Sequence, residues 1–241
     1  SHDLRIKKNK KTFDRLKYLE SHMHTYADYF LACSTKDVTE LLRLNKNRIK
    51  GLLVPNGTTQ KKVIEKDFSE PSLIFCGSLD YAPNKNGLLW FYEMIWPKLK
   101  MTVKGITLTV IGRNGQDNAY APLKIDPQIN FIGEVKDVTP YYLKNNIAIV
   151  PLLEGSGTRL KILEAMSFGL PVISTCIGAE GIDYIENKHI IIANDPIAFQ
   201  QVIIDTVNKP AILKKIGKHS SMLITEKYTW QNIVMKLHTE L

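Results

Sequence analysis

The sequence lacks several features that would place a protein in a membrane or outside the cell. No apolar run approaches the ~20 residues of a membrane-spanning helix, and residues 1–11 are basic and polar, unlike a secretory signal peptide. Cysteine is scarce: Cys33, Cys76 and Cys176 form neither a Cys-x-x-Cys pair nor a Cys/His cluster. This odd count argues against a disulfide framework and against a zinc site. We therefore expect reduced core thiols in a cytoplasmic protein.

Acidic residues are outnumbered by basic ones, 24 to 32, so the formal net charge is +8. The lysine clusters are Lys7-Lys8, Lys10-Lys11, Lys61-Lys62 and Lys214-Lys215. Such a surface permits peripheral contact with the anionic inner face of a membrane, and ordinary solubilisation is the alternative for each cluster. Aromatic residues do not interleave with the basic ones, so we expect no nucleic-acid partner.

Short apolar runs alternate with segments of helical spacing along most of the chain. Strands are predicted at 29–34, 50–54, 73–76, 106–111, 129–133, 147–150, 172–174 and 190–192. Helices are predicted at 12–30, 37–44, 87–96, 138–144, 196–207 and 211–225. This alternation predicts an α/β fold with a Rossmann-like parallel sheet flanked by helices. Ligands of such sheets bind beyond the carboxyl ends of the strands, and Gly77, Gly112 and Gly133 each end a predicted strand.

The most informative segment is GSGTRLKILEAM at 155–166, followed by Gly-Leu-Pro-Val-Ile at 169–173. Glycines let the backbone approach a ligand closely, and the first N–H groups of the helix that follows favour an anion. Arg159 and Lys161 add positive charge at the helix start, and Glu164 is placed one turn further to accept hydrogen bonds from hydroxyls. The segment predicts a site for a nucleotide that carries a ribose or a sugar. A structural turn with a solvated glutamate is the alternative.

This segment resembles the signature of retaining GT-B glycosyltransferases, especially family four, and the resemblance extends from about Tyr18 to the C-terminus. It implies two Rossmann-like domains that face each other across a cleft. Residues 1–58 would be the end of the N-terminal acceptor domain, joined by a linker at 59–70 to a nucleotide-sugar-binding domain at 71–225. Residues 226–241 would form a terminal helix at the domain junction.

The resemblance also implies an activity: retaining transfer of a sugar from a UDP- or GDP-sugar to a saccharide or lipid-linked acceptor. Polysaccharide or lipopolysaccharide biosynthesis is the expected setting, with no cofactor and no metal. A longer chain or a partner chain would supply the rest of the acceptor domain, so we expect no transfer by this chain alone. The alternative is a module that binds a nucleotide-sugar without turnover.

Three cations are the expected catalytic residues, because negative charge grows on the departing diphosphate: Lys85, Arg159 and Lys161. Lys85 ends a loop from Gly77 that is similar to the family's Gly-Arg-Leu…Lys-Gly loop, with Ser78 in place of the arginine. Arg159 or Lys161 would replace the missing charge.

Glu164 matches the family's second signature glutamate, which binds both ribose hydroxyls. The first glutamate should lie at position 156, which is Ser156. Either Glu154 or the backbone of Gly155 and Ser156 would then contact the sugar, and residues 131–135 resemble the loop that holds the nucleobase. The full set of predicted donor-binding residues is Gly77, Ser78, Asn84, Gly112, Arg113, Gly133, Glu134, Val135, Glu154, Gly155, Ser156, Gly157, Thr158, Leu160 and Glu164.

Overall fold

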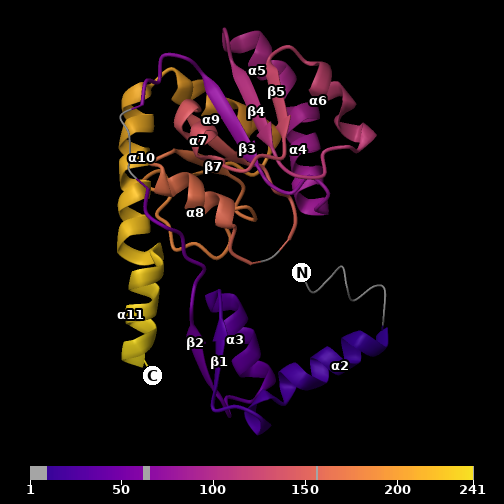
Figure 1. Cartoon of the computed structure of the whole chain (residues 1–241), viewed down its shortest axis with the longest axis vertical. Helices are drawn as coiled ribbons and strands as arrows, with labels where there is room; N and C mark the ends of the chain where they lie inside the picture. Colours follow the sequence, from indigo (N-terminus) through magenta and orange to yellow (C-terminus); the bar gives the residue numbers. More distant parts are fainter. Residues whose placement is uncertain (1–9, 62–65, 156, 241) are drawn as a thin grey trace.

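A computed structural model describes residues 10–61, 66–155 and 157–240. A large lobe contains a six-stranded sheet, and a smaller lobe contains a two-stranded sheet (Figure 1). Two helices near the C-terminus, α10 (Pro210–Leu223) and α11 (Trp230–Glu240), follow one another along one side, so that α11 descends beside the small lobe (Figure 1). None of the helices in the described ranges has the length and apolar character needed to cross a bilayer.

The small lobe is a strand–helix–strand unit preceded by a helix, α2 (Lys10–Ser21). Strand β1 (Tyr29–Ala32) leads into α3 (Thr35–Leu44), and α3 leads into β2 (Lys50–Leu53), which pairs with β1 in parallel. Ser34 begins α3 because its hydroxyl accepts a hydrogen bond from the Asp37 N–H. The predicted strand–helix–strand order is confirmed. The helix expected over 12–30 ends earlier, where the chain turns through a single 3-10 turn.

The large sheet has the strand order β5-β4-β3-β6-β7-β8, with every pair parallel. Its strands are β3 (Ser72–Cys76), β4 (Thr107–Ile111), β5 (Ile129–Gly133), β6 (Ile147–Val150), β7 (Val172–Ser174) and β8 (Ile191–Ile192). The predicted parallel α/β sheet is confirmed. The chain adds strands on one side of β3 and then on the other, so a topological switch point lies between β3 and β6, where such sheets bind ligands.

Helices cover both faces of this sheet because successive strand residues point to opposite sides. Leu73 and Phe75 of β3 face one core, and Ile74 between them faces the other. The first core packs against α4 (Ala82–Met94), α5 (Trp96–Thr102) and α9 (Pro196–Val207). The second packs against α7 (Thr139–Lys144) and α8 (Leu160–Ser167), the helix of the glycine-rich segment.

One helix prediction in the large lobe, 87–96, was wrong at both ends, and the helices α5 and α6 (Ala121–Ile125) were missed. Helix α4 begins at Ala82, five residues before the predicted start at 87, and has a proline in its first turn. Pro97 does not end the helical region, because it lies in the first turn of α5, where its missing N–H leaves no helical hydrogen bond unmade.

The prediction of core cysteines was wrong for two of the three. Cys33 directly follows β1 and Cys176 lies two residues beyond β7, and both thiols are exposed because the chain leaves the sheet at these points. Cys76, the last residue of β3, is partly buried.

The chain passes between the lobes twice, and the two connections contact each other. The first follows β2, and the second contains a single π-helical turn (Ile224–Tyr228) and the extended Thr229 between α10 and α11. The Thr58 N–H donates to the Tyr228 carbonyl at 2.8 Å, and Thr58 and Thr229 form an isolated parallel bridge. These hydrogen bonds hold the two connections side by side.

Candidate functional site

A pocket of about 310 Å³ lies at the carboxyl ends of β3, β4 and β5, beside α8. It brings together predicted site residues that are far apart in the sequence: Gly77, Ser78, Gly112, Arg113, Glu134, Val135, Lys161 and Glu164. Cys76, Ile111 and Val138 complete its wall. The predicted ligand-facing edge of the sheet therefore contains an open cavity with both cations and carboxylates.

Glycine is required just after β4, where two backbones approach closely, and a glycine after β3 leaves room for the Lys161 side chain. A Cβ atom on Gly112 would lie 1.9 Å from the Gly77 carbonyl oxygen, and one on Gly77 would lie 2.5 Å from the Lys161 Nζ. The first distance excludes a side chain at 112 because the carbonyl is main chain, whereas a side chain at 77 would displace the flexible end of Lys161. The glycines thus allow the Lys161 ammonium to lie directly against the main chain after β3.

Lys161 enters the pocket wall from α8. Its Nζ donates to the Asn84 Oδ1 at 2.6 Å and lies 4.9 Å from the centroid of the Phe75 ring. Burial lowers the pKa of Lys161 to about 7. No ion pair of Lys161 occurs among the residues that the structure describes. The ammonium has three N–H donors, and the Asn84 amide oxygen accepts from one of them. The others are suited to bind an anionic ligand.

Glu164 lies one turn further along α8 and is oriented by a tyrosine. The buried Tyr142 hydroxyl donates to the Glu164 Oε2 at 3.3 Å, and the Tyr142 ring stacks on Phe168 with 5.2 Å between centroids. Burial raises the pKa of Glu164, and the hydrogen bond from Tyr142 opposes that rise. The result is a fixed carboxylate on the pocket wall, which can accept hydrogen bonds from a pair of hydroxyls.

Ser78 stands where the family has an arginine, and the cation beside it is Arg113 rather than Arg159 or Lys161, which were expected to replace that charge. The Arg113 Nε, from the loop after β4, donates to the Ser78 Oγ at 2.7 Å. Arg113 also lines the pocket, whereas Arg159 does not. Because β3 and β4 are neighbours in the sheet, the loop after β4 brings positive charge next to the loop after β3.

Two of the three predicted catalytic cations lie outside this pocket. Lys85 is in the first turns of α4 and forms an ion pair with Asp117, so its side chain is directed away. Arg159 is buried beneath Gly155, where a Cβ would lie 2.7 Å from its Nη2, and burial lowers its pKa. Lys161 is the predicted catalytic cation that the structure brings to the pocket.

The remaining predicted donor-binding residues that the structure describes do not line this pocket. Asn84 is behind Lys161, Gly133 ends β5 with φ +81°, and the Thr158 Oγ1 donates to the Cys33 carbonyl at 3.4 Å. Glu154 and Gly155 line a separate cavity of about 430 Å³. Leu160 lines another of about 390 Å³, which Glu164 shares. Gly157 has φ +84°, a conformation that favours glycine, and Ser156 lies outside the described residues.

Sequence reasoning missed the residues that hold the site from behind. Phe75 lies under the Lys161 ammonium, and Tyr142 donates to Glu164. Both belong to apolar segments that predict only core packing. Their polar roles depend on contacts between residues that are distant in sequence.

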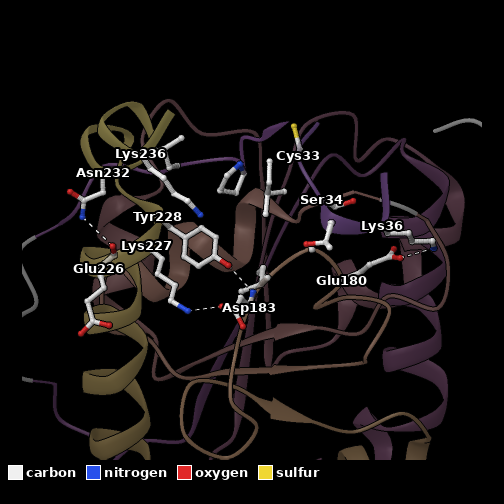
Figure 2. A pocket seen from close by; sticks show the side chains of 16 residues that line it. Cys33, Ser34, Lys36, Glu180, Asp183, Glu226, Lys227, Tyr228, Asn232 and Lys236 are labelled. Atoms are coloured by element: carbon white, nitrogen blue, oxygen red, sulfur yellow. Dashed lines mark hydrogen bonds and ion pairs between the residues drawn. The ribbon is translucent and has the colours of Figure 1, made fainter. Parts of the chain in front are cut away.

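A larger cavity of about 620 Å³ lies between the lobes, lined by the residues just after β1, the start of α3, the loop at 180–183, the π-helical turn and α11 (Figure 2). Two ion pairs lie in its wall: Lys227 with Asp183 at 2.5 Å and Lys36 with Glu180 at 2.8 Å. The Tyr228 hydroxyl accepts a hydrogen bond from the Asp183 N–H at 2.7 Å. These pairs link the loop at 180–183 to the small lobe and to the second connection.

Metal ligands do not gather in the part of the chain that the structure describes. Within 10–61, 66–155 and 157–240, no group of three or more His, Cys, Asp or Glu side chains is arranged to hold a metal ion.

The fold and the site define a class of α/β proteins with a pocket at the carboxyl ends of a parallel sheet, and comparison with known proteins narrows that class. The chain belongs to the family described as glycosyl transferases group 1, whose model matches residues 70–209. This range contains the whole pocket.

Relatives and solved structures agree with this family. The chain is 29% identical over 182 residues to an uncharacterized 44.6 kDa protein in the cps region of Klebsiella pneumoniae, covering 72% of the chain and 47% of the relative. It is 24% identical over 147 residues to an uncharacterized glycosyltransferase of Haemophilus influenzae, covering 58% of the chain and 41% of the relative. The chain thus spans less than half of the length of these two relatives.

The solved structures share the fold at low sequence identity. TarM superposes with a TM-score of 0.76 at 16% identity, over 94% of this chain and 45% of TarM. Anabaena HepE in complex with UDP-glucose superposes with a TM-score of 0.72 at 12% identity, over 94% of this chain and 68% of HepE. The fold of the chain is therefore the GT-B glycosyltransferase fold.

Proposed function

We propose that this chain is the donor-binding part of a retaining glycosyltransferase that uses a UDP- or GDP-sugar. The observation that carries the proposal is the position of Lys161 and Glu164, one turn apart on α8, in one pocket at the carboxyl ends of β3, β4 and β5. A cation and a carboxylate at this spacing suit the diphosphate and the ribose of one nucleotide.

The transferred sugar leaves a diphosphate, on which negative charge grows as the bond to the anomeric carbon breaks. Lys161 and Arg113 would stabilise that charge, because both are cations on the pocket wall. Glu164 would accept hydrogen bonds from the ribose, and the loop at 133–135 would hold the nucleobase through its backbone. Each aligned cation in a site of this kind contributes a few kcal/mol, on the order of 10²-fold in rate.

The compared proteins support the choice of donor and setting. HepE has been solved with UDP-glucose, and a TarM variant from S. aureus has been solved with UDP. The Klebsiella relative comes from a cps region, which supports polysaccharide biosynthesis as the setting. We propose a saccharide or a lipid-linked saccharide as the acceptor.

We further propose that the chain divides as the sequence suggests, with 1–58 as the end of an acceptor domain and 71–225 as the donor domain. The relatives are about twice as long as the matched region, which leaves room for the rest of an acceptor domain. We therefore expect at most slow donor hydrolysis from the 241-residue chain, and transfer only from a longer form or with a partner chain. Rapid transfer to a saccharide by this chain would contradict the division.

A lipid-linked acceptor would suit peripheral contact with an anionic membrane surface, through the basic clusters. Lys7, Lys8 and Lys62 lie outside the described residues. Co-sedimentation with vesicles that contain phosphatidylserine, but not with neutral vesicles, would support this contact, and equal binding to both would contradict it.

Titration calorimetry tests the donor site. We expect UDP or GDP to bind with a dissociation constant between about 1 μM and 1 mM, or about −8 to −4 kcal/mol. Lys161→Met should weaken nucleoside diphosphate binding at least tenfold and change uridine or guanosine binding little, because the charge acts on the phosphates. Lys104→Met, at an exposed lysine just before β4, is the matched control. No heat with either nucleotide at several millimolar would contradict the assignment.

A module that binds donor without turnover is the second candidate, and one observation favours it. The Glu154 Oε1 accepts a hydrogen bond from the Asn86 Nδ2 at 2.6 Å, and Glu154 lines a separate cavity rather than the pocket. If UDP-glucose binds no more tightly than UDP and is not hydrolysed, the module is favoured. Measurable hydrolysis that Lys161→Met abolishes favours the enzyme.

A further inference from the structure

We infer that Asn84 is a positioning residue, which holds the Lys161 ammonium in place and does not itself contact the nucleotide. This inference rests on the proposed function, since Lys161 is taken to act on a diphosphate. Asn84 does not line the pocket, although the residue that it contacts does.

Asn84 joins three parts of the site. It lies in the first turn of α4 and is 5% exposed. Its Nδ2 donates to the Ser78 carbonyl at 2.9 Å, and its Oδ1 accepts from the Lys161 Nζ at 2.6 Å. A single side chain therefore connects the loop after β3 to the cation on α8.

The chemistry of the two partners requires an amide at this position. An ammonium can only donate hydrogen bonds, and a backbone carbonyl can only accept them. The side chain between them must accept on one side and donate on the other, which Asn does and ionised Asp or Ala does not. The pattern of donors and acceptors also fixes which end of the amide faces Lys161.

Asn84 is the polar side chain that α4 presents to the Lys161 ammonium. The Phe75 ring lies below the ammonium. The Cys76 thiol of β3 and the Arg159 guanidinium at the start of α8 act on the pKa of the ammonium. Arg113 from the loop after β4 and Glu164 line the same pocket. Burial lowers the pKa of Lys161 to about 7, and the hydrogen bond to the Asn84 oxygen opposes this because it favours the charged form.

Two substitutions should change the pH dependence of nucleotide binding in opposite directions. Asn84→Ala removes the acceptor, so the ammonium loses its proton at lower pH. Asn84→Asp adds a negative charge beside the ammonium, so the ammonium keeps its proton to higher pH. A residue that merely supported the fold would weaken binding without moving the pH at which it declines.

The experiment is UDP titration from pH 6 to 9 with the full 241-residue chain. The affinity of the wild-type chain should decline above about pH 7, the Asn84→Ala curve should decline at lower pH, and the Asn84→Asp curve at higher pH. At pH 7 we expect Asn84→Ala to bind UDP about tenfold more weakly, or about 1.4 kcal/mol. Asn208→Ala, at an exposed asparagine that ends α9, should leave the curve unchanged.

Asn84→Ala in a Lys161→Met background tests whether Asn84 acts through Lys161. If it does, adding Asn84→Ala should change UDP affinity by less than about twofold. A further tenfold loss would show direct contact with the nucleotide and overturn the inference, as would identical pH curves for all three forms. If Asn84→Ala does not fold, the shift of Asn84→Asp decides.

UDP binding by the wild-type chain and its pH dependence separate a failure of the proposed function from a failure of this inference. If the wild-type chain binds no UDP or GDP, the proposed function fails and this inference fails with it. If wild-type binding is intact and depends on Lys161, but the Asn84 variants do not shift its pH dependence, only the inference fails.

Discussion

Replacing Gly112 with alanine tests the close approach of backbones that forms the pocket. The added Cβ would lie 1.9 Å from the Gly77 carbonyl oxygen and 2.9 Å from the Leu79 Cγ. The first neighbour is main chain, so relief requires the ends of β3 and β4 to separate by about 1 Å or more. That movement would strain the hydrogen bonds from Gly77 N–H to Ile111 and from Gly112 N–H to Gly133, at 3.0 and 2.9 Å.

The expected cost combines overpacking, about 1–3 kcal/mol, with about 1 kcal/mol for a weakened hydrogen bond. A loss of about 3 kcal/mol in a chain of this size lowers the Tm by about 6–12 °C. UDP binding should fall below detection at about 1 mM, because the loops that carry Ser78 and Arg113 would move apart. Thermal unfolding and calorimetry measure the two effects.

Gly105→Ala is the control for the conformational effect of losing a glycine. Gly105 has φ +74°, and no heavy atom lies within 4 Å of the position that a Cβ would take there. The change therefore adds backbone strain of about 1 kcal/mol without a collision. UDP binding should be retained. If the Gly112→Ala protein has the Tm and UDP affinity of the Gly105→Ala protein, the close approach of the main chain at Gly112 and Gly77 is not required for the pocket.

Three further predictions use other contacts of the site. Tyr142→Phe removes the hydrogen bond that opposes the raised pKa of Glu164, so UDP and uridine should both bind about fivefold more weakly. Weaker binding of UDP alone would contradict a contact between Glu164 and the ribose. Burial lowers the pKa of Lys161 from 10.5 to about 7. Between these two pH values the folded chain binds fewer protons than the unfolded chain, so the free energy of unfolding rises with pH. Lys161→Met should therefore show a smaller Tm rise from about pH 7 to 10 than the wild-type chain, and equal slopes would count against the burial. In thiol labelling, Cys33 and Cys176 should react before Cys76, because they are exposed and burial raises the pKa of Cys76 to about 11. UDP should slow the labelling of Cys76 further, and fast labelling of Cys76 would be inconsistent with its position in the pocket.

The strands and the position of the pocket were predictable because they depend on local patterns. Short apolar runs such as 147–150 mark buried parallel strands, and glycines at 77 and 112 mark where two strands end. The charged helix start at 159–164 places Lys161 and Glu164 one turn apart. These features are set by neighbouring residues along the chain, so periodicity detects them.

The cations of the pocket were harder to predict because their neighbours are distant in sequence. Lys85 lies in a helix rather than a loop, since Ala82 and Pro83 begin α4, and its charge is taken by Asp117. Arg113 reaches Ser78 only because β4 lies beside β3. Residue spacing alone does not reveal either partnership.

The most direct test of the donor site is a crystal structure of this chain with UDP. We expect the diphosphate within hydrogen-bond distance of the Lys161 Nζ, the ribose hydroxyls on the Glu164 carboxylate, and the base against the loop at 133–135. UDP bound elsewhere, or a diphosphate that contacts Lys85 instead of Lys161, would contradict the proposed donor site.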